Sequence, residues 1–207
     1  MASAGALLLA ATTASVSSPS SVRISLGGTP VGYSHVTSSG FDGRFSSSRG
    51  GGELRAGGSY RSWGFLDLGA VTSWSHPYSS EVHAFRVLAS ALVVMNPGAP
   101  VEFGAGLRFG LFVATEQLVG WRPGGPVTYP PPERYTATYV GLAGILAVEA
   151  RIRIAPQVQL GSYLDLGVAS GTGSVRNAQF EPYLGSYLTG RLESLSIEPG
   201  IAGWLAF

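Results

Sequence analysis

Three histidines, His35, His76 and His83, are the side chains best suited to acid–base chemistry in this chain. A Ser–His–acid hydrolase needs its nucleophile, base and orienting carboxylate within hydrogen-bond reach of one another. His35 is followed two residues later by the hydroxyl of Thr37, whereas His76 lies between Ser75 and Pro77. These spacings indicate surface histidines near the bases of loops, and we expect that the protein is not an enzyme. A hydrolase centred on His35 is the alternative.

Metal and cofactor motifs are equally sparse. The chain has no cysteine, so it has no disulfide and no thiolate metal site. The histidines lack ligand spacing, and Asp42 with Glu53 lacks a third ligand. Gly50-Gly51-Gly52 is followed by neither a helix nor a lysine, so it is not a phosphate loop. We expect no cofactor and no metal.

The charge content sets the class of protein. Charged residues make up 12% of the 207 residues, about half the ~25% that is usual in soluble domains, while 45% are hydrophobic. The formal net charge is +1 and there is no lysine, which excludes a basic patch for nucleic acid. A membrane protein would explain the shortage of charges, but no apolar run approaches the ~20 residues of a spanning helix.

Hydrophobic residues recur at every second position. In Val101–Phe112 the odd positions are apolar, and the even positions from 102 to 110 are Glu, Gly or Arg. This period is typical of a β-strand with one apolar and one small or charged face. The same alternation predicts further strands within residues 22–26, 53–61, 66–74, 142–154, 158–168 and 195–207. Residues 82–95 are apolar on both faces, with Arg86 placing one of them, and they complete a set of eight predicted strands.

The connections between these strands alternate in length. Short turns are predicted at 62–64, 96–99 and 155–156, where Asn96-Pro97-Gly98 is strong turn chemistry. Long loops are predicted at 32–52, 75–81, 114–133 and 170–194. The pattern predicts an all-β, up-and-down antiparallel barrel with short turns at one end and long loops at the other.

The direction of the apolar face separates two kinds of barrel. A soluble, lipocalin-like ligand binder points it inward, and a membrane barrel points it at lipid. The polar face carries too few charges for a water-facing exterior, and its basic and acidic residues nearly balance, as a confined lumen requires. We therefore expect these charged residues to form a network in the lumen. The alternative is that they face water and that their basic and acidic numbers balance by chance. Its members are Arg23, Glu53, Arg55, Arg61, Asp67, Arg86, Glu102, Arg108, Glu149, Arg151, Arg153, Asp165 and Glu198.

Aromatic residues lie near the predicted strand ends, as in the interfacial girdles of membrane barrels. They are Tyr60, Trp63, Phe65, Trp74, Tyr78, Trp204 and Phe207.

With these features the chain resembles the small eight-stranded outer-membrane β-barrels of Gram-negative bacteria, the group of the OmpA transmembrane domain, OmpX and OmpW. The last segment, Ile201–Phe207, looks like the C-terminal strand that the barrel assembly machinery of this group recognises. Gly203, Leu205 and the terminal Phe207 occupy the positions of that signal. The resemblance covers residues 22–207. It implies an integral bacterial outer-membrane location, with membrane lipid, lipopolysaccharide and the assembly machinery as partners.

The first 21 residues contain the apolar run Ala6–Ala11 followed by small polar residues. This pattern is typical of a secretory signal peptide, although no basic residue precedes the run. A flexible leader or a mis-assigned start is the alternative.

The expected function is structural or adhesive, with a largely plugged lumen and loops that meet lipopolysaccharide, surfaces or partners. A narrow, porin-like conduit for small or apolar solutes, as in OmpW-type barrels, is the first alternative. A lipid-modifying enzyme is another, because lipid A deacylases of this membrane carry a His-x-Ser motif. This chain departs from that motif, because His35-Val36 is followed by Thr37 in place of Ser and by Ser38 in place of the usual Asn.

Overall fold

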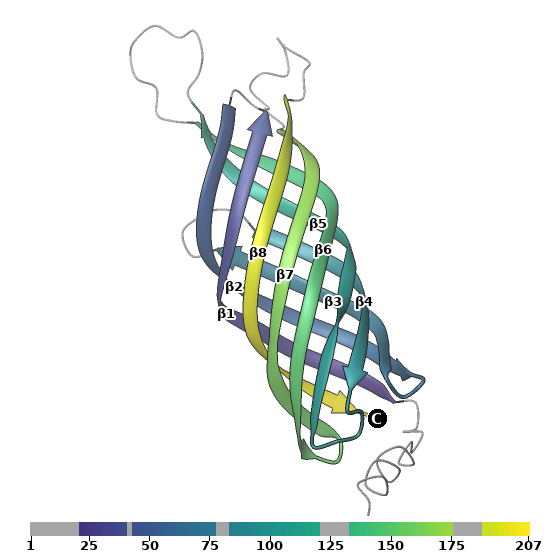
Figure 1. The fold of residues 1–207 in the computed structure, drawn as a ribbon. Coiled ribbons are helices and arrows are strands. Elements are labelled where there is room, and N and C mark those ends of the chain that lie inside the picture. Colours follow the sequence, from purple (N-terminus) through teal and green to yellow (C-terminus); the bar gives the residue numbers. More distant parts are fainter. Residues whose placement is uncertain (1–20, 41–42, 78–82, 121–132, 176–187) are drawn as a thin grey trace, which may run out of the picture.

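The computed structural model describes residues 21–40, 43–77, 83–120, 133–175 and 188–207. These residues form eight strands in a closed barrel, each hydrogen-bonded to the next in sequence (Figure 1). The strands are β1 (Val22–Gly40), β2 (Gly43–Ser62), β3 (Leu66–Pro77), β4 (His83–Met95), β5 (Val101–Gly120), β6 (Glu133–Ala155), β7 (Val158–Val175) and β8 (Leu188–Ala206). Within these ranges no helix is long and apolar enough to cross a membrane.

The first and last strands close the ring. Leu205 of β8 pairs with Ile24 of β1 on one side and with Val158 of β7 on the other, and all pairings are antiparallel. Closure leaves no sheet edge along this part of the wall, so the backbone N–H and C=O groups are satisfied within the barrel. The predicted up-and-down eight-stranded architecture is confirmed.

The strands are longer than the hydrophobic alternation predicts. The predicted loop 32–52 is wrong, because β1 continues to Gly40 and β2 starts at Gly43, with Gly32 paired to Gly51. Backbone pairing extends through this Ser- and Gly-rich stretch without an apolar face to signal it. Parts of the predicted loops 114–133 and 170–194 are likewise strand, in β5 up to Gly120 and in β7 up to Val175.

The barrel wall is shorter at the β3–β4 hairpin, at the end opposite the short turns. β2 begins to pair with β3 only at Gly51–Pro77, and β4 pairs with β5 only up to His83–Thr115. β1, β2, β5, β6, β7 and β8 all continue beyond this level, and Figure 1 shows them rising past the β3–β4 hairpin.

The short turns adopt backbone conformations that need particular residues. Asn96 and Gly98 have positive φ values of 53° and 84°, which suit an Asn and a Gly. The turn between β2 and β3 uses positive φ at Trp63 and Gly64. These turns lie at the same end of the barrel as the C-terminus (Figure 1).

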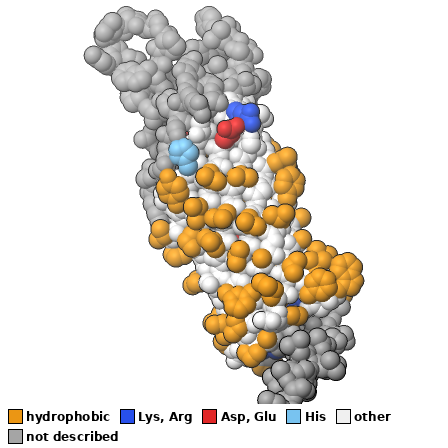
Figure 2. All heavy atoms as spheres, viewed as in Figure 1, with side chains coloured by type: hydrophobic (Ala, Val, Ile, Leu, Met, Phe, Trp, Pro, Cys, Tyr) orange, Lys and Arg blue, Asp and Glu red, His pale blue; other side chains and the backbone are white. Residues whose placement is uncertain are grey.

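The outer surface of the barrel wall is apolar. Leu107 is 64% exposed, whereas the next residue, Arg108, is 2% exposed. One continuous row of paired outward residues crosses seven strands and contains Tyr60, Leu68, Ala91, Leu107, Leu146, Leu166 and Ile197. Figure 2 shows apolar side chains gathered over the middle and lower parts of one face, with charged side chains above them.

Aromatic residues at the strand ends only partly form the predicted girdles. Tyr60, Trp63, Phe65, Trp74 and Phe207 are exposed on the outer surface. The prediction that Trp204 belongs to a girdle is wrong, because its side chain is 4% exposed and lies inside the barrel. Alternation along β8 turns Trp204 inward together with Ala202, and the Arg151 guanidinium lies over its ring at 5.1 Å. Tyr78 lies outside the described residues.

Candidate functional site in the barrel lumen

A first group of ionised side chains fills the lumen near the short turns. This turn-end cluster contains Arg23, Arg61, Arg151, Asp67 and Glu102. Asp67 accepts from all three arginines, at 3.0 Å from Arg23, 2.7 Å from Arg61 and 2.6 Å from Arg151. Glu102 pairs with Arg61 at 2.9 Å and accepts the backbone N–H of Gly98 at 2.8 Å. The cluster therefore anchors the second short turn as well as the wall.

A central cluster comes next along the bore. Its members are Arg55 (β2), Arg108 (β5), Glu149 (β6) and Asp165 (β7). Arg55 lies 2.9 Å from Glu149 and 3.2 Å from Asp165, and Arg108 contacts the same two carboxylates. Glu149 also pairs with Arg151 at 2.8 Å, which joins the central and turn-end clusters. These contacts cross the bore, because β2 is not a neighbour of β6 or β7.

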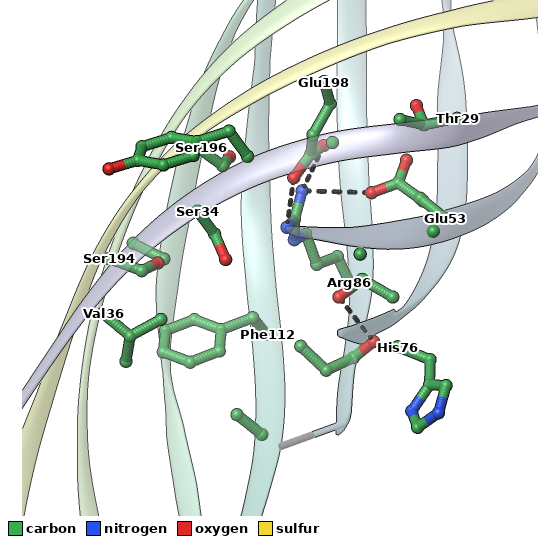
Figure 3. A pocket seen from close by; sticks show the side chains of 18 of the residues that line it. Thr29, Ser34, Val36, Glu53, His76, Arg86, Phe112, Ser194, Ser196 and Glu198 are labelled. Carbon is green, nitrogen blue, oxygen red and sulfur yellow. Dashed lines mark hydrogen bonds and ion pairs between the residues drawn. The ribbon is translucent and has the colours of Figure 1, made fainter. Parts of the chain in front are cut away.

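A third group, the loop-end cluster, contains Arg86, Glu53 and Glu198. Arg86 holds both oxygens of Glu198, at 2.7 and 2.9 Å, in a bidentate pair. Its Nη1 lies 3.4 Å from Oε2 of Glu53. Figure 3 shows Arg86 between the two carboxylates.

Formal charge is distributed unevenly along these clusters. Three arginines face two carboxylates in the turn-end cluster, two face two in the central cluster, and one faces two in the loop-end cluster. The local balance therefore runs from +1 through zero to −1. The buried network as a whole has no formal net charge. Its positive excess lies at the turn end and its negative excess at the loop end.

The structure places the side chains of the expected lumen network inside the barrel, with one difference. Arg153 has a side chain that is 36% exposed, and its Nη2 lies 3.5 Å from Glu102. It belongs to the mouth of the bore at the short-turn end, because β6 ends two residues later at Ala155.

Sequence reasoning missed an apolar part of the lumen. Leu88, Leu92, Phe112, Tyr139, Ile145 and Leu192 belong to one buried cluster. The signal was present in β4, where Leu88 and Leu92 share the inward face with Arg86. Tyr163 was also missed, and the Arg55 guanidinium lies 3.3 Å above its ring.

A cavity of about 80 Å³ lies on the loop-end side of the ionic clusters. Glu53, Arg86 and Glu198 line it, together with hydroxyl groups and apolar side chains of the missed cluster. Ser34, Ser194 and Ser196 supply hydroxyls, and Val36 and Phe112 supply apolar surface (Figure 3). Leu192 adds to the apolar lining.

Of the histidines, His76 lines this cavity, whereas His35 and His83 do not. A β-bulge between Thr29 and Gly32 changes which residues of β1 face inward, so Val36 is buried and His35 and Thr37 lie on the opposite face. His76 and His83 stack on each other, with Nδ1 atoms 3.2 Å apart, and also on Trp74. The spacing of seven residues hid this contact, which the β3–β4 pairing creates. No group of three or more metal-ligating side chains occurs among the described residues.

The proposed assembly-signal residues end the last strand. Leu205 and Phe207 are exposed on the outer surface, and Gly203 lies between them and Ile201 on the same face. The Phe207 N–H donates to the Val22 carbonyl at 2.9 Å, which fixes the terminal residue to β1.

Comparison with solved structures finds similar chains. The chain is similar to the crystal structure of Neisserial surface protein A, with 18% identity, a TM-score of 0.45, and coverage of 90% of this chain and 97% of that one. It is similar to the outer membrane protein OprG from Pseudomonas aeruginosa, with 8% identity, a TM-score of 0.48, and coverage of 89% and 95%.

A further similar structure is the outer membrane protease OmpT from Escherichia coli, with 9% identity, a TM-score of 0.44, and coverage of 91% of this chain and 97% of that one. No protein-family model matches the chain, and no curated protein matches it. The closed strand order and the outward apolar surface of the barrel carry the reasoning about function.

Proposed function

We propose that this barrel is integral to the bacterial outer membrane, with its lumen closed and its long hairpins available for surface interactions. The outward rows of Leu, Val, Ile and Phe support the membrane location. An exposed apolar surface of this extent would drive aggregation in water and is stable against lipid chains.

Closure of the lumen rests on one observation, the ion pairs that cross the bore in the turn-end and central clusters. Arg55 and Arg108 meet Glu149 and Asp165 from four different strands, and the side chains of all four are at most 4% exposed. Opening a path would separate buried charges from their partners, which costs about 3–5 kcal/mol for each broken pair. Solutes therefore do not pass freely.

The surface role rests on the hairpins at the loop end. β1–β2, β5–β6 and β7–β8 extend beyond the level at which β3–β4 ends. Arg191 and Glu193 are exposed there and pair with each other at 2.9 Å. We assign lipopolysaccharide or surface partners to these hairpins, and the C-terminal Gly203, Leu205 and Phe207 to recognition by the assembly machinery. The role involves no catalytic step and no cofactor.

Single-channel recording in planar bilayers tests this function. We expect the wild-type barrel to give no stable conductance steps. The double variant R108A/D165A shortens two side chains of the central cluster without a net charge change, and we expect it to conduct small ions.

The surface variant E193Q serves as the control and should remain closed. Stable wild-type steps that are unaffected by R108A/D165A would contradict closure. They would favour the alternative of a narrow conduit, which the cavity at the loop end makes the second candidate.

A further inference from the structure

We propose that Glu53 and Glu198 share one proton, and that the resulting hydrogen bond links β2 to β8 behind an irregular stretch of β1. This inference goes beyond the closed-barrel role, because it concerns how the ring is held together where its first and last strands meet. It makes the stability of the barrel depend on pH.

The irregular stretch of β1 is Thr29–Gly32. The pairing of β1 with β2 shifts register between Thr29 and Gly32, and the pairing of β1 with β8 is interrupted between Gly28 and Tyr33. The facing part of β8 contains Pro199, which has no backbone N–H to donate. Side-chain contacts therefore contribute more to holding β2, β1 and β8 together here than elsewhere along the seam.

Two glutamates flank this stretch on the lumen side. Glu53 of β2 pairs with Thr29, and Glu198 of β8 directly follows Ile197, the last residue that pairs with β1 before the interruption. A hydrogen bond joins the two carboxyl groups, whose side chains are 4% and 7% exposed. An ionised carboxylate only accepts hydrogen bonds, so one of the two groups carries a proton. This bond connects β2 directly to β8, with β1 between them in the wall.

Arg86 of β4 indicates which carboxyl group carries the proton. Its two terminal nitrogens donate to Glu198 at 2.7 and 2.9 Å, whereas its Nη1 lies 3.4 Å from Glu53. Glu198 is therefore the ionised partner, and protonated Glu53 donates to it. The proton removes the negative excess that the fully ionised loop-end cluster would have, which matters because uncompensated charge is costly when it is buried.

The other titratable and charged groups around the two glutamates have partners of their own. Asp165 lies beside Glu198 in the wall and is held by two arginines. His76 lines the neighbouring cavity and stacks on His83. Among the described residues, Arg86 is the cation paired with Glu53. The groups around the two glutamates are Asp165 and Tyr163 on β7, Arg55 on β2, Arg108 on β5 and His76 on β3.

The cavity next to the two glutamates gives the proton access to water. Glu53 and Glu198 line it, and its volume of about 80 Å³ exceeds the roughly 10–15 Å³ that one water molecule needs. Ser34, Ser194 and Ser196 line the same space, and their hydroxyl groups both donate and accept hydrogen bonds. We therefore expect the proton to exchange without unfolding of the barrel.

Loss of the proton breaks the link between β2 and β8 and leaves two carboxylates beside one guanidinium. In the unfolded chain a glutamate is ionised above about pH 4.3, so the folded barrel binds one proton more than the unfolded chain. The folding equilibrium constant is therefore expected to fall about tenfold for each unit of rising pH, until the folded barrel has also lost the proton.

Urea unfolding of the full-length barrel in lipid vesicles, from about pH 5 to about pH 9, tests the proposal. We expect the wild type to lose stability as the pH rises. E53Q imitates the protonated glutamate, because its amide donates to Glu198 and does not titrate. We expect this fall to be absent in E53Q, and E53Q to be more stable than the wild type at the alkaline end. An equally steep fall in E53Q, or no fall in the wild type, would overturn the proposal.

The matched control is E193Q, which removes a carboxylate from the exposed surface near the loop end. We expect it to keep the pH dependence of the wild type. Loss of that dependence in E193Q as well would assign it to the overall charge of the barrel and overturn the shared proton. If Glu53 were instead an ionised partner of Arg86, E53Q would be less stable than the wild type at every pH, which would also overturn it.

Infrared spectroscopy of the folded wild type stays informative if E53Q does not fold. A protonated carboxyl group has a C=O stretch separate from the carboxylate bands, and a detergent without carbonyl groups leaves it visible. We expect this band at neutral pH, with the intensity of one carboxyl group per chain, and its loss at the pH where the stability stops falling. Its absence at neutral pH would overturn the proposal. Conductance reports separately on closure of the lumen, so failure of either proposal is visible without the other.

Discussion

Arg151 on β6 and Asp67 on β3 form an ion pair at 2.6 Å, although β4 and β5 separate these strands in the barrel wall. Asp67 accepts two further guanidiniums, from Arg23 on β1 and Arg61 on β2. One carboxylate thus joins four strands across the bore. A buried pair adds little net stability compared with an apolar core, but loss of one partner leaves uncompensated charge.

Replacement of Asp67 by Asn is therefore expected to destabilise the barrel strongly. D67N keeps the shape of the side chain and leaves Arg23, Arg61 and Arg151 without their shared carboxylate. We expect a loss of about 3–5 kcal/mol. Urea unfolding in lipid vesicles, followed by heat-modifiable migration on gels, measures it. The exposed variant E193Q is the control, and an unfolding midpoint for D67N that equals that of E193Q would contradict the structural role of the cluster.

A charge on the outward face is expected to be costly in lipid. Leu107 lies in the continuous apolar row and pairs with Ala91 and Leu146. We expect L107R to lose about 2–4 kcal/mol of stability in lipid vesicles. S174R is the control, because Ser174 points outward close to the loop end of β7. Comparable unfolding free energies for L107R and S174R would argue against a lipid-facing Leu107.

The ring of Phe112 depends on glycine beside it. A Cβ at Gly171 would lie 2.8 Å from Phe112 Cζ and 2.8 Å from the Val140 carbonyl oxygen. We expect G171A to cost about 1–3 kcal/mol through overpacking.

The matched control for G171A is G144A, because a Cβ at Gly144 meets no atom closer than 3.9 Å. Unfolding in vesicles should therefore separate the two variants, with G144A close to the wild type. Equal stability of G171A and G144A would show that Phe112 is not held by this close contact.

The alternation of residue types predicted the fold because each strand has one lipid-facing and one lumen-facing side. Arg108 between Leu107 and Phe109 was enough to assign both faces of β5. The extents of β1 and β2 were not predictable in the same way. Residues 32–40 and 43–52 are mostly Ser and Gly, and their strand structure comes from pairing with neighbours such as Ser196 and Pro77.

The sequence identified the charged residues of the candidate site, and the contacts among them depended on the shape of the barrel. Which carboxylate meets Arg55 depends on strand tilt and on distance across the bore, so Glu149 and Asp165 could not be assigned as its partners. The cavity was also hidden, because Phe112, which lines it, is apolar on the face where the pattern indicated polar residues. Nearness to the strand end predicts Trp204 in a girdle, whereas its position in the alternation of β8 puts it inside the barrel, where it is buried.

Oxygen accessibility of single spin labels along β5, in lipid vesicles, tests the inside-out polarity most directly. The chain has no cysteine, so each single-cysteine variant from Val101 to Phe112 carries one label. We predict high accessibility to lipid-dissolved oxygen at Phe103, Leu107, Phe109 and Leu111, and low accessibility at Glu102, Arg108 and Phe112. The reverse alternation, or none at all, would contradict the account.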